Sequence, residues 1–437
     1  MPHGFFYILV SLVLISIVLA WLKSGSIINP VSFFMAWWGL FVFVSGLDLA
    51  GIRLPRNETY LLIFFSMALF SVGGITFLSS CANKTSGNTN NDRSGNYLLK
   101  DNKKIQLFLY SQLVITVILM IFADKGLDML KSLDPGTYRY MVYTDYGIFQ
   151  GHKVLVNYIL RPAVFAGAFI TMTGAVTGLI PKKYYGLAIF NMFIYSIVIL
   201  GRSSIIMAIM CFFIALMYYM SVRKIRIRIR YVLILLIPVV FLISLSIFRK
   251  SQYVSGKSGT DIIVDYFIWY LTGPFTAFDY FLNTYREGAD YDFTFFRMTL
   301  AGLEDVIEPA IRKIFPDFNQ IFRKYTEILG TYRDFGGPAT HHNSHYTMLF
   351  TFFADAGTAG IALYSYLFGA LISVVFNSFR RKTDLFNLSA LTLLTYLCML
   401  GTTRWDFMFS WPWLTVAVVF FVSKRFVLEN KYRGKIV

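Results

Sequence analysis

The chain has 437 residues, of which 56% are hydrophobic and only 15% are charged, and its mean hydropathy is +0.58. Because soluble domains carry about 25% charged residues, the chain has too few charges to cover a water-facing surface, which excludes a soluble protein. The formal net charge is +16, but the basic residues are concentrated in short connections between apolar runs, which excludes a nucleic-acid-binding protein.

Apolar runs of roughly 17–25 residues, the length that crosses the hydrocarbon core of a bilayer, recur along the chain. They predict an all-α polytopic integral membrane protein with about eleven transmembrane helices, within a range of ten to twelve. The first run is expected to remain as a span, because no small-residue cleavage site and soluble chain follow it. The predicted spans are Phe5–Leu22, Val31–Leu47, Tyr60–Leu78, Ile105–Ala123, Val154–Ile180, Tyr184–Leu200, Ile205–Met220, Tyr231–Phe248, Tyr346–Phe376, Leu385–Leu400 and Phe409–Val422.

The distribution of charge predicts the orientation of these spans. The loop 124–153 contains four bases and four acids, and the loop 249–345 contains ten bases and twelve acids. Short basic connections mark the cytoplasmic side of a membrane, so the two balanced loops are expected outside, with the C-terminus inside and the N-terminus outside. The basic connections are Ser79–Lys104, Lys182–Lys183, Arg223–Arg230, Arg380–Lys382 and Lys424–Lys435.

This threading predicts three parts: residues 1–248 with eight spans and the short outer loop 124–153, a large outer loop 249–345, and residues 346–437 with three spans and a basic tail. Within the large loop, Ile262–Leu282 is apolar and aromatic but contains two aspartates and Gly273-Pro274. We expect it to form an interfacial or re-entrant pair of half-helices rather than a full span. The remainder, to Arg333, has the pattern of amphipathic surface helices.

Three of the five histidines, His341, His342 and His345, lie within five residues at the end of the large loop. Three interpretations remain open. His341 and His345 share a face if the run is helical, which suits zinc, although no second cluster supplies a carboxylate or cysteine. The histidines could instead form a structural interface. Alternatively one of them acts as a general base or positions a hydroxyl or phosphate, because imidazole titrates near neutral pH.

Four arginines are predicted near the outer boundary of the membrane. Arg161 precedes Pro162 in the fifth span, Arg202 lies in a two-helix turn, Arg249 ends the eighth span, and Arg404 ends the tenth. Guanidinium groups match phosphate oxygens bidentately, so convergence of these residues would create an anion site. The alternative is that each side chain extends separately to lipid phosphates.

Several familiar motifs are absent from the sequence. There is no Walker loop, no HExxH and no GxGxxG after a strand, and the three cysteines have no CxxC spacing. ATP-driven transport within this chain is therefore not expected, and no cofactor is expected.

The apolar run Tyr346–Phe376 has 31 residues, about 46 Å as one helix, which exceeds the ~30 Å hydrocarbon core. It is expected either to extend above the membrane or to break near Gly357–Gly360. Ala356 and Gly360 are also interpreted as a small-residue surface for close helix packing. Asp355 is expected to orient a histidine or an arginine, or to bond only to backbone.

Several segments of the chain together resemble one protein family. The run from His342 to Gly360, with its D-x-G-x-x-G core at Asp355 directly after the largest loop, resembles a segment of bacterial O-antigen polymerases, the Wzy-type oligosaccharide repeat-unit polymerases. Similar features are Ile28-Asn29-Pro30 before the aromatic Phe33–Trp38, the turn Gly201-Arg202-Ser203, and Tyr270–Pro274 with Phe278-Asp279-Tyr280. The resemblance covers most of the chain in topology and about 30 residues in motif. The long Arg-to-Gly spacing motifs of some polymerases are missing.

The resemblance implies a metal-independent, inverting glycosyltransferase in the bacterial inner membrane with its active site facing the periplasm. Donor and acceptor would be oligosaccharides on undecaprenyl diphosphate, which is the leaving group, so no nucleotide is needed. His342, His345 and Arg202 are the expected catalytic residues, and Arg161, Arg202, Arg249 and Arg404 are expected to bind the diphosphate. His341, Asp355 and Arg333 are expected to support them.

Two alternatives remain open. An O-antigen ligase uses the same donor and similar residues but transfers the glycan to the lipid A core. A lipid-linked oligosaccharide flippase or exporter predicts charged residues deep within the helices, whereas here they cluster near the outer boundary. The resemblance also implies a chain-length regulator as a partner, beside the lipid bilayer itself.

Overall fold

The computed structural model describes residues 1, 3–48, 51–79, 103–142, 147–177, 182–201, 203–223, 259–286, 293–319, 321, 334–335 and 346–423. Secondary structure in these ranges consists of helices and turns, which confirms the all-α prediction. Six of the described helical segments are long and apolar enough to cross a membrane, and four shorter apolar helices accompany them. These ten segments coincide with ten predicted spans. The eighth, Tyr231–Phe248, lies outside the described residues, so the total of eleven stays a prediction.

The described chain forms two compact units that interleave along the sequence. Unit 1 comprises Met1–Ser80, Thr260–Asn377 and Leu394–Trp413, and unit 2 comprises Cys81–Gly259, Ser378–Leu393 and Leu414–Val437. The three-part division at residues 248 and 345 concerns membrane topology and stays a prediction.

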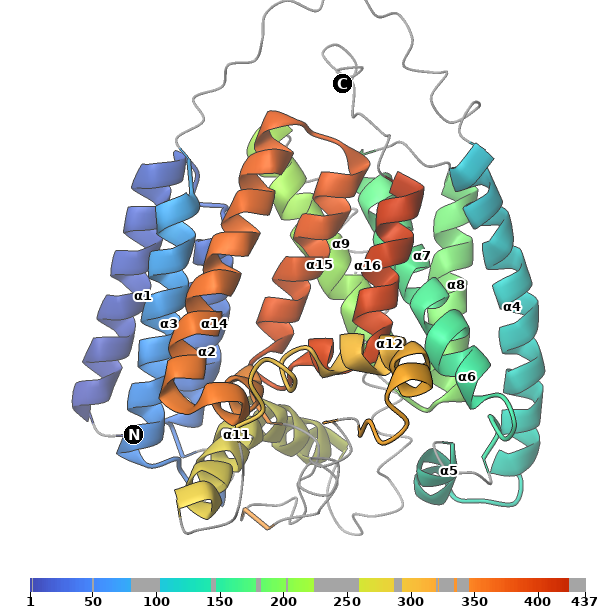
Figure 1. Ribbon diagram of the computed structural model, residues 1–437, viewed down its shortest axis with the longest axis horizontal. Coiled ribbons are helices and arrows are strands. Elements are labelled where there is room, and N and C mark those ends of the chain that lie inside the picture. Colours follow the sequence, from blue (N-terminus) through green and yellow to red (C-terminus); the bar gives the residue numbers. More distant parts are fainter. Residues whose placement is uncertain are drawn as a thin grey trace, which may run out of the picture. The chain divides into compact units, whose positions relative to one another are not determined.

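Unit 1 contains three N-terminal helices that pack on one another, with α14 running beside them and α11 lying crosswise at their ends (Figure 1). Its elements are α1 (His3–Ser24), α2 (Pro30–Ser45), α3 (Asn57–Phe77), α11 (Gly259–Arg286), α12 (Ala301–Ile314), most of α14 (Met348–Arg381), the end of α15 (Leu385–Leu400), the 3₁₀ turn η3 (Asp406–Met408) and the start of α16 (Ser410–Ser423).

The predicted motif at Ile28-Asn29-Pro30 is a helix start. The Asn29 side chain accepts a hydrogen bond from the backbone N–H of Ser32 at 3.0 Å, and Pro30 occupies the first helical position of α2, the arrangement that caps helix N-termini. Two turns later, Trp37 and Trp38 donate to the carbonyls of Met399 and Cys398 at 2.9 and 3.0 Å. These carbonyls belong to the last turn of α15, which lacks intrahelical donors, so α2 caps α15.

Contacts define two ends of unit 1. At one end, the N–H of Arg56 and the hydroxyl of Thr59, at the start of α3, donate to Asp279 of α11 at 2.9 and 2.5 Å. α14 begins at this same end of unit 1, where the N–H of Met348 donates to the carbonyl of Gly401 at 2.7 Å. At the opposite end, the N–H of Ser79, after α3, donates to Asn377 of α14 at 3.2 Å.

Glycines allow α3 and α14 to cross closely. A methyl group on Gly73 would overlap the Tyr366 carbonyl, and one on Gly369 would overlap the Phe70 carbonyl. Small residues at such a crossing bring two backbones together, which is a common way of packing helices in membranes.

The predicted pair of half-helices at Ile262–Leu282 is wrong, because α11 is one helix that contains Pro274. A proline inside a helix removes one backbone hydrogen bond, and packing outweighs that loss here. Phe275, Phe278 and Phe281 are buried, and the ring of Phe281 lies 4.5 Å from that of Phe350 in an edge-on arrangement. The interfacial placement of this segment stays a prediction.

Unit 2 is a bundle in which α8 packs against α4, α7 and α9. A buried polar cluster joins α4 to α8: Asn191 donates to the Gln112 carbonyl at 3.0 Å and accepts from Thr116 at 2.6 Å. The elements are α4 (Lys103–Leu130), α5 (Pro135–Met141), α6 (Lys153–Leu155), the π-turn η2 (Val156–Leu160), α7 (Arg161–Thr177), α8 (Lys182–Val198), α9 (Ser203–Arg223), the start of α15 and the end of α16.

The glycine crossing can be tested with a matched pair of substitutions. Gly369→Ala adds a methyl group where the Phe70 carbonyl lies, and overpacking of this kind costs about 1–3 kcal/mol, so the melting temperature in detergent should fall. Gly186→Ala in α8 adds the same group where nothing lies within 4 Å, and should leave it unchanged or raise it. Equal melting temperatures would show that α3 and α14 do not pack as described.

Candidate functional site

Six of the nine predicted site residues lie outside the described residues: His341, His342, His345, Arg202, Arg249 and Arg333. Their roles stay predictions. Of the other three, Asp355 and Arg404 belong to unit 1 and Arg161 belongs to unit 2. Within the described ranges, no group of three or more His, Cys, Asp or Glu residues could hold a metal ion.

The predicted break in the long apolar run is confirmed at Ala356 and Gly357, which divide α14 into two helical parts. Gly357 has φ 59° and ψ −143°, a conformation open essentially to glycine alone. A methyl group on Gly360 would overlap the carbonyl of Phe352 across the break. Gly360 therefore serves the break within α14, rather than the packing of another helix that the sequence also suggested.

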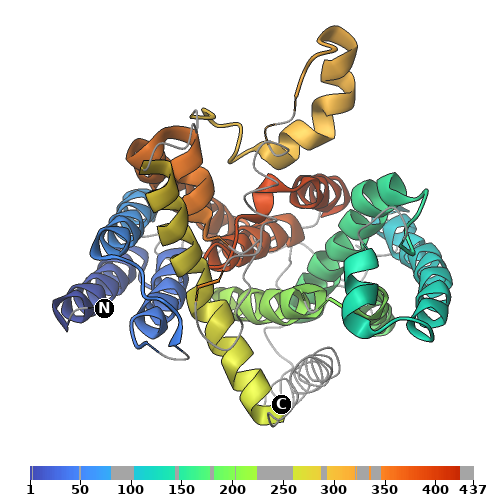
Figure 2. The same ribbon diagram turned by 90° about the horizontal axis from the view of Figure 1, so that it is seen from below.

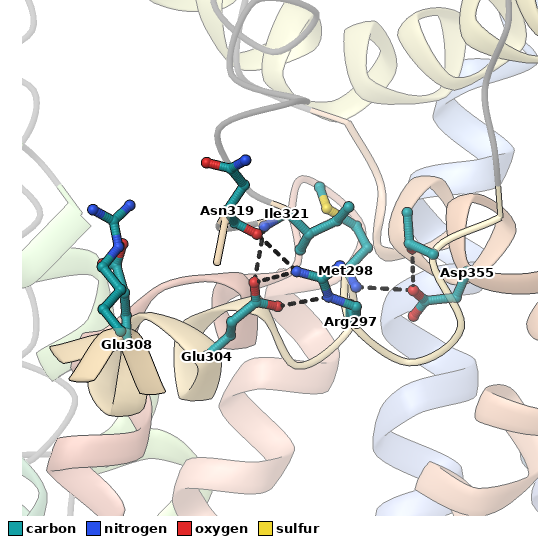
Figure 3. A network of polar contacts seen from close by, with 9 residues as sticks. Arg297, Met298, Glu304, Glu308, Asn319, Ile321 and Asp355 are labelled. Atoms are coloured by element: carbon teal, nitrogen blue, oxygen red, sulfur yellow. Dashed lines mark hydrogen bonds and ion pairs between the residues drawn. The ribbon is translucent and has the colours of Figure 1, made fainter. Parts of the chain in front are cut away.

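Asp355, at the break, is fully buried and bonds to one turn of the large loop. Its carboxylate accepts hydrogen bonds from the Thr294 hydroxyl and from the backbone N–H groups of Met298 and Thr299, the last two at 2.9 Å. Figure 3 shows the carboxylate directed at this turn. The prediction that Asp355 bonds only to backbone is therefore wrong, because the Thr294 hydroxyl is a side-chain partner, and orientation of a histidine stays a prediction.

We call residues 293–300 the phenylalanine turn. Phe295 and Phe296 both have positive φ, 42° and 68°, which is rare for bulky residues and costs free energy. The turn is held from several directions, because the N–H groups of Thr294 and Phe295 also donate to the carbonyls of Ala354 and Asp355 at 3.1 and 3.0 Å. These carbonyls end the first part of α14, so the turn caps that helix.

Two further contacts fix the turn. Trp405, buried against Phe352 and Phe368, donates to the Thr299 carbonyl at 3.0 Å. Arg297 binds the Glu304 carboxylate at 2.8 Å through Nη2 and at 3.3 Å through Nε (Figure 3). The sequence pattern showed charged residues alternating with apolar ones here, but it gave no sign of which residues pair.

Arg404, predicted to bind a diphosphate, forms an ion pair with buried Asp406 at 2.5 Å. Its guanidinium carbon also lies 5.5 Å from the centre of the Phe409 ring. An anion at Arg404 would have to compete with the Asp406 carboxylate, which weakens the prediction for this residue.

Arg161 lies where the π-turn η2 passes into α7. Pro162 follows it, has no N–H, and cannot complete the normal hydrogen-bond pattern, which is a common cause of local helix irregularity. Such π-turns occur frequently at functional sites. The Arg161 guanidinium lies 5.6 Å from the Phe165 ring centre, and Phe165 packs edge-on against Tyr195 of α8 at 6.0 Å.

Sequence analysis did not single out Arg139, which the structure places at the end of α8. Arg139 Nη1 donates to the Ile199 carbonyl, and the neighbouring Tyr138 hydroxyl donates to the Val198 carbonyl at 2.6 Å. Burial raises the pKa of Tyr138 to about 12, against the opposing effect of the Arg139 charge, so this hydroxyl remains a donor at neutral pH. Together the two side chains of α5 cap the final carbonyls of α8.

Gly201 follows this cap and α9 begins at Ser203, while Arg202 between them lies outside the described residues. A methyl group on Gly201 would lie 3.4 Å from Arg139 Nη1, so the guanidinium is adjacent to Gly201.

No family model, curated protein or solved structure matches this chain. The resemblance to O-antigen polymerases therefore depends on the motifs and the order of the elements alone.

The clamp at Asp355 predicts a local loss of structure on substitution. Asp355→Asn keeps the side-chain size but leaves one buried N–H or hydroxyl without its acceptor, which costs about 1–3 kcal/mol. Amide hydrogen exchange at residues 294–300 should accelerate. Exposed Asp317, beyond α12, provides the control, and Asp317→Asn should leave exchange unchanged. If Asp355→Asn preserves protection at Met298 and Thr299, the carboxylate does not hold the turn.

Proposed function

We propose that this protein is an O-antigen polymerase: a glycosyltransferase that joins undecaprenyl-diphosphate-linked oligosaccharide repeat units at the periplasmic face of the bacterial inner membrane. The observation that carries the proposal is the position of Arg139 beside Gly201, the first residue of the Gly201-Arg202-Ser203 sequence that resembles that family.

The proposed chemistry is a displacement at the anomeric carbon of the donor sugar. The acceptor hydroxyl attacks, the bond from this carbon to the diphosphate oxygen breaks, and the diphosphate leaves with its negative charge. Cations aimed at the departing oxygens stabilise that charge. In the proposal, Arg202 and Arg139 supply these cations. Arg161 supplies a third, because it is the first residue of α7 and α7 begins beside the end of α8.

The N-terminus of α9 supports the same assignment. α9 begins at Ser203 and has 21 residues, and the N–H groups at the start of a helix favour bound anions. The acceptor hydroxyl would lose its proton to His342 or His345. The leaving group already carries its activation, so the reaction requires neither nucleotide nor metal ion.

Charge on the connections supports a periplasmic location. Arg380 and Arg381 end α14 at the opposite end from Asp355. In unit 2, α9 runs from the Gly201 turn to Arg223, where a strongly basic connection begins. Because basic connections stay in the cytoplasm, the Asp355 break and the Gly201 turn are both assigned to the outer side.

The first test uses lipopolysaccharide banding in a host that lacks this protein. Complementation with wild type should restore the ladder, whereas Arg202→Ala or His342→Ala, at matched expression, should leave the core plus one repeat unit. A full ladder from both variants would remove these residues from the site. If the host without the protein lacks even the single-repeat band, the activity is ligation or flipping.

Arg139 has its own test in the same assay. Arg139→Ala should shorten or abolish the ladder because a cation is lost beside the diphosphate. Tyr138→Phe removes the adjacent bond to α8 but no charge, and Lys131→Ala removes an exposed cation from the same loop; both should retain the ladder. If Tyr138→Phe abolishes the ladder at normal expression, Arg139 acts through the α8 cap instead.

A further inference from the structure

The phenylalanine turn exposes three aromatic rings. Phe293, Phe295 and Phe296 have 42%, 69% and 49% of their surface accessible. Large apolar side chains gathered on a surface mark a site of contact with a protein or a membrane, and Asp355 holds this turn in a strained conformation that keeps the rings outward. Strain maintained by several bonds is typical of functional segments.

The exposed rings continue an apolar stripe on α14. Phe296 packs edge-on against Tyr364 of α14 with 5.4 Å between ring centres. The residue before Tyr364 begins a stripe spaced three and four residues apart, which is one helix face, and α14 is among the helices able to cross a membrane. The members of the stripe, each 44–45% exposed, are Leu363, Leu367, Leu371 and Val374.

α12 extends this surface sideways. Its first turn packs against η3 and Phe409, where a methyl group on Gly302 would overlap the Phe409 carbonyl, and the helix then projects from the rest of unit 1 (Figure 2). Ile307 and Ile314, seven residues apart on one face, are exposed, as is the following Phe315. This pattern is typical of a helix that lies in a membrane interface.

Two ion pairs lie near this surface. Glu304 is paired with Arg297 at 2.8 Å, and Glu308 with Arg312 at 2.8 Å. These pairs leave apolar burial, rather than attraction to charged headgroups, as the force that would hold the surface in a bilayer.

We propose that the phenylalanine turn and the apolar face of α12 are inserted at the boundary between headgroups and acyl chains of the membrane that α14 crosses, and that Asp355 sets their depth. The occupant of this surface is bilayer phospholipid, and the proposal does not depend on the enzymatic function.

The test uses the full-length protein in lipid nanodiscs with the fluorophore bimane on single introduced cysteines. Cys81→Ser provides the background, because Cys211 and Cys398 are buried. Labels are placed by Phe295→Cys and Ile314→Cys, both at exposed positions, and by Lys131→Cys as a water-exposed control. Brominated phospholipid and aqueous iodide serve as quenchers.

Brominated lipid should quench the labels at 295 and 314 at least twofold more than the label at 131, and iodide should show the reverse order. The result should be the same in zwitterionic and anionic lipid. Quenching at 295 and 314 by iodide alone would overturn the proposal. Protection from both quenchers, which indicates a covering protein or second copy, would overturn it too, as would lipid-like quenching that appears only with added prenyl-linked substrate.

Discussion

The described part of unit 1 depends on the bond between the Asp355 carboxylate and the phenylalanine turn. The carboxylate holds two backbone N–H groups and a hydroxyl, and the same turn caps the first part of α14. The break at Gly357 and the two positive-φ phenylalanines are each unfavourable alone. Together they satisfy the polar groups that a broken helix exposes, which is the condition for irregular backbone at membrane depth. The phenylalanine turn and α14 therefore stabilise each other.

A comparable arrangement occurs at the end of α8 in unit 2. There Tyr138 and Arg139 of α5 satisfy the last carbonyls of α8, and the chain turns at Gly201 into α9. A short helix from the loop 124–153 thus holds the end of α8 just before Gly201. In both units a loop segment caps a broken or ending helix, and in both the cap lies beside a motif that resembles the polymerase family. The position of these caps beside the motifs is what connects the fold to the proposed chemistry.

Hydropathy predicted the helices well, because length and apolar character alone decide which segments can cross a membrane. The break in α14 was also predictable, since 31 apolar residues exceed the bilayer and glycines lie within them. The continuity of α11 was not, because Pro274 is a local signal whereas the burial of Phe278 and Phe281 is tertiary. Nor were the partners of Asp355 and the position of Arg139, because Thr294 is 61 residues from Asp355 and Ile199 is 60 from Arg139. No local pattern encodes such pairs.

Reconstitution tests the central claim most directly. Purified protein in nanodiscs would receive lipid-linked repeat units extracted from a host that lacks it, with a metal chelator present and no nucleotide added. The account predicts a ladder of lipid-linked glycans and the release of one undecaprenyl diphosphate for each unit joined. Absence of elongation under these conditions, or glycan transfer only when lipid A core is supplied, would contradict it.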